Sequence, residues 1–386
     1  MNKLKNKYKI SVLILLIVLS LGVIFYLRGQ VRPMGKEQLE AVNPPTVEER
    51  ADRIVNKMSD AEKIGQLMMI GVKGTAVNDD ITYMINEYHM GGIILFDRNL
   101  SDKAQVKSMT KGLQHLGGDV PLFIAIDQEG GAVIRMRQEL TAPPAAAVIG
   151  ANGSTSEAEK WAKKTAAELK ELGINVNFAP VADVGGHDGR SYSEDPGVVT
   201  SFVRAAANGY AQSGMLYSLK HFPGIGKGGG DSHIDSSVIK ADKSLLIAED
   251  LSPFRTLVAE LNPEDYFIMV SHLTYLALDE KQPASLSPII TNNLLRGEMG
   301  FQGIIITDDM EMGAVSRHYD FDVLGVKAVQ AGADIVLVCH EYEHEVAVYN
   351  GMLRALENGE LDRRKIDESV RKIIRMKLKK CRADSI

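Results

Sequence analysis

The sequence is poor in cysteine, and this scarcity excludes two kinds of site. Its 386 residues include only Cys339 and Cys381. Two isolated cysteines form neither a disulfide framework nor a zinc cluster. Cys339 follows the apolar run 335–338, so we expect a buried side chain that behaves as a small hydrophobe.

Acidic residues are absent from the first 30 positions and in excess in the rest. Residues 1–30 hold five basic residues, which leaves 39 basic against 50 acidic residues in the remainder. An acidic body argues against nucleic acid as a partner, and against an anionic membrane surface as a partner of the folded part.

The N-terminus combines four lysines with an apolar run from Ile10 to Leu27. The run is just long enough to span a bilayer, and no small-residue cleavage site follows it. We therefore expect an uncleaved signal anchor over 1–28, a linker over 29–45 and a folded body over 46–386. A cleaved signal peptide is the alternative. In both cases the positive-inside rule predicts a body outside the cytoplasmic membrane, anchored or secreted.

No glycine-rich phosphate loop follows the first apolar run of the body, which disfavours a doubly wound open sheet. Eight short apolar runs alternate with stretches long enough for helices, such as 156–172, 241–260 and 323–332. Strands that are apolar throughout are typical of a parallel sheet covered on both faces. We predict an α/β fold, a (β/α)8 TIM barrel. The runs are 66–72, 92–96, 122–127, 174–180, 216–221, 266–272, 303–308 and 333–339.

Helix signals flank the barrel at both ends. Thr46 with Glu49 and Ser59 with Glu62 have the spacing of capping boxes, in which each side chain bonds the other residue's backbone N–H. The stretch 362–380 is a basic amphipathic helix that we expect to pack on the barrel, with its charges on a solvated face.

Chargeable residues lie at the ends of five predicted strands. In a TIM barrel the strand ends at one face carry the active site. Buried charge is unfavourable unless it is paired, so the set as a whole indicates a functional site, although any one member can brace a loop. The residues are Asp127, Asp183, Lys220, His221, His272, Asp308 and Asp309.

A glycine-rich loop follows the fifth strand. It has five glycines between Gly224 and Gly230 and then carries Asp231 and His233. A loop with few side chains can move, and a mobile titratable pair suits a general acid. A plain exposed connection is the alternative.

Eight stretches together resemble glycoside hydrolase family 3, and within it the single-domain β-N-acetylglucosaminidases. They include Thr307-Asp308-Asp309-Met310 and occur in family order from about residue 50 to the C-terminus. The stretches are 58–67, 91–99, 126–131, 190–196, 220–224, 231–233, 271–273 and 307–310.

The resemblance implies a retaining exo-β-N-acetylglucosaminidase that needs no metal or cofactor. Asp308 matches the nucleophile, and His233 with its dyad partner Asp231 matches the acid/base. A histidine fits this role because its ordinary pKa, about 6.5, lies near working pH. Asp309 follows Asp308 in a strand, so we expect it to face away and to be structural.

The resemblance also implies a carbohydrate-binding set. Carboxylates accept hydrogen bonds from sugar hydroxyls, while arginine and lysine donate to hydroxyl and acetamido oxygens. We expect Arg98 and Asp183 to brace the barrel mouth instead. The predicted binding residues are Asp127, Arg190, Lys220 and His221, with Arg135 and His272 as weaker candidates.

The sequence departs from the family pattern at two places. Ala132 stands where the family usually has arginine, and residues 225–228 replace a His-Gly-Asp-Thr motif with Ile-Gly-Lys-Gly. The expected substrate is a peptidoglycan fragment. The departures leave open an altered leaving-group preference, weaker activity, a different amino sugar or another β-glycosidase specificity, and phosphate remains open as an acceptor in place of water.

Two other classes of function stay open from the sequence. One is a metal-dependent hydrolase built on His221, Asp231, His233 and His272, which a glycine-rich loop supports poorly because metal ligands need rigid backing. The other is a non-catalytic sugar-binding barrel, which needs neither Asp308 nor the dyad.

Overall fold

The computed structural model describes residues 2–30, 44–186, 188–226 and 238–381. The chain divides into two compact units, Met1–Arg50 and Ala51–Ile386. In the first unit, helix α1 (Asn2–Gln30) contains the apolar run. Within the residues that the structure describes, no helix is both long and apolar enough to cross a membrane.

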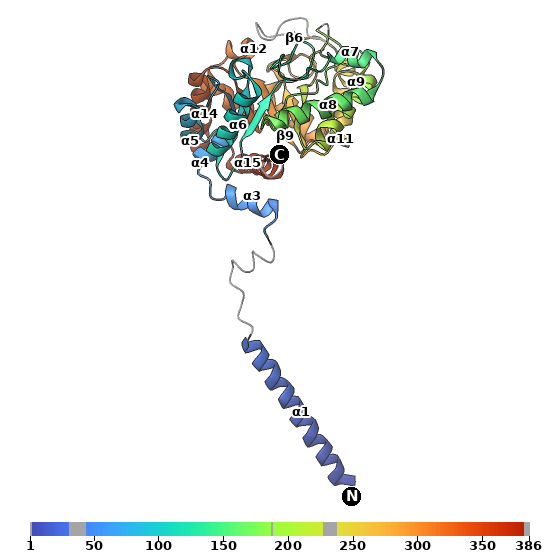
Figure 1. Cartoon of the computed structure of the whole chain (residues 1–386), viewed down its shortest axis with the longest axis vertical. Helices are drawn as coiled ribbons and strands as arrows, with labels where there is room; N and C mark the ends of the chain where they lie inside the picture. The colour runs from blue at the N-terminus through green and yellow to red at the C-terminus, as the bar shows by residue number, and fades with distance from the viewer. Residues whose placement is uncertain (1, 31–43, 187, 227–237, 382–386) are drawn as a thin grey trace. The chain divides into compact units, whose positions relative to one another are not determined.

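The second unit is built on a closed parallel barrel (Figure 1). Around the barrel the strands follow the order β1-β10-β9-β7-β5-β4-β3-β2. Each predicted apolar run supplies one of these strands, and the predicted (β/α)8 fold is confirmed. The strands are β1 (Met68–Gly71), β2 (Gly92–Leu95), β3 (Phe123–Ile126), β4 (Val176–Asn177), β5 (Leu216–Phe222), β7 (Tyr266–Val270), β9 (Ile304–Asp309) and β10 (Ile335–Val338).

Helices surround the barrel, as the pattern of apolar runs predicts. A small parallel pair, β6 (Val238–Ile239) with β8 (Thr274–Tyr275), lies outside the barrel sheet. The helical elements are α3 (Val47–Val55), α4 (Asp60–Gln66), α5 (Asp79–Glu87), η1 (Asp97–Asn99), α6 (Lys103–Gly117), α7 (Ala146–Ala151), α8 (Thr155–Glu171), α9 (Pro196–Gln212), α10 (Lys243–Ala248), α11 (Leu251–Glu260), η2 (Ala284–Leu286), η3 (Ile289–Glu298), α12 (Gly313–Ser316), α13 (Phe321–Ala331), α14 (Tyr342–Glu357) and α15 (Arg363–Lys380).

Both predicted capping boxes form. The N–H of Glu49 donates to Thr46 Oγ1 at 3.1 Å and the N–H of Thr46 to Glu49 at 2.9 Å. Ser59 and Glu62 make the same reciprocal pair at the start of α4. The predicted helical stretch 241–260 is instead two helices, α10 and α11, with the fully buried Asp250 at their junction.

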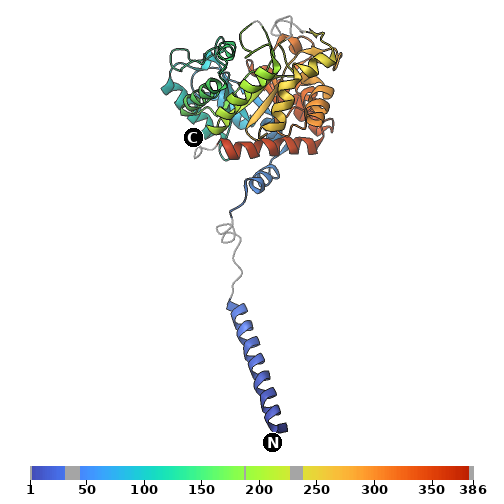
Figure 2. The same cartoon turned by 90° about the vertical axis from the view of Figure 1, so that its right-hand side faces the viewer.

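The C-terminal helix α15 packs across one end of the barrel (Figure 2). Its apolar face is buried as predicted, including Ile366, Val370 and Ile373. The fully buried Lys377 reaches from this face to within 5.1 Å of the Phe123 ring on β3. This end holds the N-termini of the strands, and we call it the base; their C-terminal ends form the mouth.

Candidate active site

A cavity of about 290 Å³ opens at the mouth of the barrel. Its volume is near the lower end of the range for small-molecule sites, about 300–1,000 Å³. The cavity therefore suits a ligand the size of one sugar unit. Its polar lining residues are Asp127, Glu129, Arg135, Arg190, Lys220, His221, Asp308, Asp309 and His340.

Glu129 is the centre of the charged wall of this cavity. Its carboxylate accepts two hydrogen bonds from Arg190, each at 2.8 Å, and pairs with Lys220 at 2.6 Å. Lys220 also reaches Asp127 at 2.7 Å. Burial alone raises the pKa of Glu129, but Lys220 and Arg190 outweigh it and hold the pKa well below its usual range. Glu129 therefore stays ionised and fixes the two cations in place.

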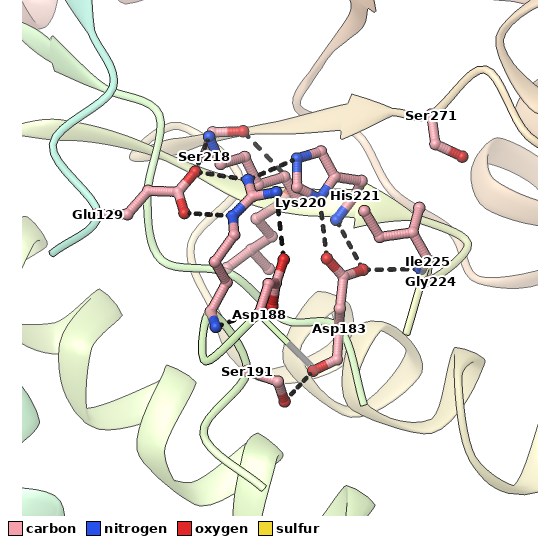
Figure 3. A network of polar contacts seen from close by, with 12 residues as sticks. Glu129, Asp183, Asp188, Ser191, Ser218, Lys220, His221, Gly224, Ile225 and Ser271 are labelled. Atoms are coloured by element: carbon pink, nitrogen blue, oxygen red, sulfur yellow. Dashed lines mark hydrogen bonds and ion pairs between the residues drawn. The ribbon is translucent and has the colours of Figure 1, made fainter. Parts of the chain in front are cut away.

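His221 extends this wall through Asp183 (Figure 3). The two Asp183 oxygens accept from the His221 backbone N–H at 3.0 Å and from His221 Nδ1 at 2.8 Å. The Ile225 N–H donates to the same carboxylate at 3.0 Å. Asp183 thus braces the backbone after β5, as predicted, and His221 presents its other nitrogen near Arg190, at 3.4 Å.

Asp308 lies at the end of β9 and lines the cavity, as expected for a nucleophile. Its Oδ1 accepts the N–H of Asp309 at 2.9 Å. Burial opposes ionisation of Asp308, but His221, this backbone N–H and Lys220 lower its pKa below the ordinary value. An ionised carboxylate beside the cavity can attack an electrophilic carbon.

Asp309 differs from the prediction, because it lines the same cavity as Asp308. The register between β9 and β10 shifts between the Ile306 and Asp309 pairs, and this irregularity breaks the strict alternation of faces. Asp309 nevertheless has structural contacts. Its carboxylate lies 3.2 Å from His340 Nε2 and accepts the Glu311 N–H at 3.1 Å.

His272 lies behind the site and is not among the residues that line the cavity. Its Nε2 lies 2.9 Å from the carbonyl oxygen of Asp309, and its Nδ1 lies 2.7 Å from Ser285 Oγ. Burial lowers the pKa of His272, so a neutral ring that donates to the carbonyl fits both contacts. Its position fits a residue that supports β9 better than one that binds the sugar.

Arg135 lines the cavity, whereas Arg98 braces its edge. Arg135 stands 3.7 Å from Asp97, and its buried Nε has no hydrogen-bond partner within the described part of the chain. Its guanidinium therefore keeps donors for a ligand. Arg98 donates to the carbonyl oxygens of Val72 and Cys339, so it braces the mouth through backbone groups. Cys339 is buried, as predicted.

Asp231 and His233, the predicted acid/base dyad, lie outside the described residues. Ile225, at the first of the departures in 225–228, lies within them and lines the cavity. Ala132, the other departure, is an exposed part of the lining on the loop after β3.

Two histidines of the proposed metal alternative are already engaged. His272 uses both ring nitrogens, and His221 uses Nδ1 on Asp183. Asp309, Glu311 and His340 place their ligand atoms within 4.8 Å of one another. Glu311, however, already accepts from the backbone N–H groups of Cys339 and Glu341 and from His344. A network of hydrogen bonds explains this cluster.

Sequence reasoning missed Glu129 and His340. Glu129 lies two residues beyond Asp127, in a stretch already singled out, and His340 directly follows the eighth strand run. The rule that polar residues at strand ends form the site would have found both.

The family comparison agrees with this geometry. The model of the glycosyl hydrolase family 3 N terminal domain matches residues 60–376. The chain belongs to glycoside hydrolase family 3, and the resemblance that the sequence indicates is confirmed. Its class of enzyme is therefore that of the glycoside hydrolases.

The relatives with similar sequences or structures include beta-hexosaminidases and a beta-N-acetylglucosaminidase. The chain is 34% identical over 336 residues to beta-hexosaminidase LpqI of Mycobacterium tuberculosis, covering 83% of each chain. It is 34% identical to beta-hexosaminidase A of Pseudoalteromonas piscicida, over 79% of this chain but only 56% of that protein. A family 3 beta-N-acetylglucosaminidase structure from Paenibacillus sp. str. FPU-7 has a TM-score of 0.81 and 37% identity, covering 84% of this chain and 63% of that one.

Proposed function

We propose that this chain is a retaining, exo-acting β-N-acetylglucosaminidase. The observation that carries the proposal is an ionised Asp308 beside a cavity of monosaccharide size. The cavity's opposite wall holds Asp127, Arg190 and Lys220 in a fixed network. The names of the relatives, beta-hexosaminidase and beta-N-acetylglucosaminidase, support the choice of amino sugar.

The geometry suits a double displacement. A terminal sugar held by its hydroxyls on the charged wall would present its anomeric carbon to Asp308. Attack would form a glycosyl ester and release the aglycone, and water would then cleave the ester. In this scheme the His233–Asp231 dyad protonates the leaving oxygen and afterwards activates the water.

The reaction can be tested with a panel of aryl glycosides and the purified chain. Turnover of the β-N-acetylglucosaminide above the glucoside and galactoside supports the proposal. Proton NMR of the first product must show the β-anomer, because a retaining enzyme preserves configuration. Initial release of the α-anomer, or turnover only of another glycoside, would overturn it.

The role of His233 has its own test. His233→Ala should slow substrates with poor leaving groups far more than activated aryl glycosides, because only the former need protonation. Equal loss on both would contradict an acid role.

We also propose that the catalytic body works outside the cytoplasmic membrane on peptidoglycan fragments. The support is the sequence alone, with four lysines before the apolar run Ile10–Leu27. Protease treatment of intact cells checks the location, and digestion of the body without cell lysis is expected. Release of N-acetylglucosamine from purified muropeptides checks the substrate.

A further inference from the structure

Among the cavity-lining side chains that form ion pairs, that of His340 is the most exposed. Its side chain is 46% exposed, against 18% for Asp127 and 3% for Lys220. It lies two residues beyond the end of β10 and lines the cavity. His340 therefore stands at the rim of the cavity, whereas the charged wall reaches into its depth.

Both nitrogens of the His340 ring are already engaged. Nδ1 lies 3.0 Å from Arg98 Nη1, and because a guanidinium can only donate, Nδ1 accepts. Nε2 then carries the hydrogen and donates to Asp309 Oδ2 at 3.2 Å. What His340 can offer a ligand is therefore the face of its ring.

Contacts with Phe96 and Glu311 also fix the orientation of the His340 ring. It packs against Phe96, with ring centroids 5.4 Å apart and planes tilted by 38°. Glu311 accepts hydrogen bonds from the backbone N–H groups on both sides of His340, those of Cys339 and Glu341, at 2.9 and 3.1 Å. A fixed, half-exposed ring loses little conformational entropy when a ligand packs on it.

The strand order shows which part of a substrate meets this ring. β10 lies across the closed barrel from β4, and the charged wall comes from β3, β5 and the loop after β4. A terminal sugar bound by that wall turns its anomeric carbon towards Asp308 on β9. The rest of the chain must leave towards the open rim, where His340 lies.

We propose that His340 is a specificity-determining residue, a platform on which the C–H face of a second sugar packs on the leaving-group side. This inference rests on the proposed function and names its substrate class, a β-linked disaccharide or longer amino-sugar chain. We expect the packing of a sugar C–H face on this ring to change affinity about as much as the packing of an aromatic pair does, by about 3- to 10-fold.

The test compares two substrates with similar leaving groups, N,N′-diacetylchitobiose and methyl β-N-acetylglucosaminide. Only the first has a second ring. His340→Ala should raise KM for the disaccharide by about 3- to 10-fold and that of the methyl glycoside by less. His340→Phe, which keeps a ring but not the hydrogen bond to Asp309, should retain the preference for the disaccharide. His115→Ala, an exposed histidine on α6, is the matched control.

Each outcome decides the matter. If His340→Ala raises KM equally for both substrates, the platform is overturned. His340 would then act by positioning Asp309 or by contacting the acetamido group of the terminal sugar. A His340→Phe variant as poor as His340→Ala would also overturn the platform. If the wild type cleaves neither substrate, the proposed function fails. Calorimetry with the disaccharide then compares Asp308→Asn with Asp308→Asn/His340→Ala, and equal affinity would overturn the platform.

Discussion

Two buried carboxylates, one at each end of the barrel, are clamped in the same way but face different surroundings. Glu129 at the mouth pairs with Arg190 and Lys220, and its side chain is 6% exposed. Asp334 at the base pairs with Arg296 and Lys372, and its side chain is 2% exposed. In both, burial raises the pKa and the two cations outweigh it.

The difference lies in what else the clamped groups contact. Asp334 also accepts from Ser369 at 2.6 Å and from the Ile305 N–H at 2.9 Å, so its cluster ties α15 to the barrel. At the mouth, Glu129, Arg190 and Lys220 all line a cavity. The same ion-pair chemistry therefore holds a helix at one end of the barrel and prepares a binding wall at the other.

The largest effect is expected from the residue with the most direct chemical role. Asp308→Asn should lower kcat by more than about 10³-fold, because the amide cannot act as nucleophile. A fluorinated sugar analogue should label Asp308 in the wild type, with the modified peptide identified by mass spectrometry. Label on another carboxylate would contradict the assignment.

The two clamps can be compared with matched variants. Glu129→Gln and Asp334→Asn each remove a buried anion that two buried or half-buried cations share, and each should lower the free energy of unfolding by about 3–5 kcal/mol. Only Glu129→Gln should also lower kcat/KM, by about 10²-fold, through misplaced binding groups.

Urea unfolding and initial rates on the same preparations measure both effects. If a folded Asp334→Asn protein loses as much kcat/KM as Glu129→Gln, the proposal that only the mouth cluster serves binding is contradicted.

The base also holds a buried lysine with a pH-dependent effect. Burial lowers the pKa of Lys377 to about 7. Between this value and its ordinary pKa of 10.5 this lysine binds more protons in the unfolded chain than in the folded one, so its contribution to the free energy of unfolding rises with pH. Lys377→Met should remove this rise and stabilise the protein near pH 7 by on the order of 1–5 kcal/mol.

Denaturant titrations at pH 6, 7.5 and 9 test this expectation. Lys160→Met, at an exposed position of α8, is the control and should leave the pH profile unchanged. A difference in unfolding free energy between Lys377→Met and the wild type that stays constant over this range would contradict a buried neutral lysine.

Near the mouth, a buried carboxyl group should make stability change with pH in the opposite direction to Lys377. Glu345 on α14 is fully buried, and burial with the nearby Glu311 raises its pKa to about 9. Between about 4.5 and 9 Glu345 is protonated in the folded protein and ionised in the unfolded one, so its contribution to stability falls as pH rises through this window.

Glu345→Gln should remove this pH-dependent fall in stability and raise the free energy of unfolding at pH 8 by on the order of 1–3 kcal/mol. Thermal melts from pH 5 to pH 9 are the measurement, and parallel curves for variant and wild type would contradict a protonated Glu345.

The smallest effect is expected at a helix cap. Ser59→Ala removes one half of the capping box of α4 and should cost about 1 kcal/mol of stability. KM and kcat should not change, because α4 precedes β1 at the base. Equilibrium unfolding measures the loss, and a change in KM would show that the base and the mouth are coupled.

Local patterns in the chain determined the fold, the caps and the position of Asp308 at the mouth of the barrel. Eight apolar runs predict eight barrel strands because both faces of a parallel sheet are covered, and the capping boxes need only residues three apart. Strand ends converge at one face of a barrel, so Asp127, Lys220, His221 and Asp308 could be grouped from their positions in the sequence alone.

Only the tertiary structure decided the partners of those residues. The shared clamp on Glu129, the support of Asp309 by His272 and the rim position of His340 join segments 31 to 242 residues apart. The shifted register between β9 and β10 also placed Asp309 at the cavity, against the simple alternation of a strand. Such pairings depend on strand register and on closure of the barrel, which are properties of the packed chain rather than of any local stretch.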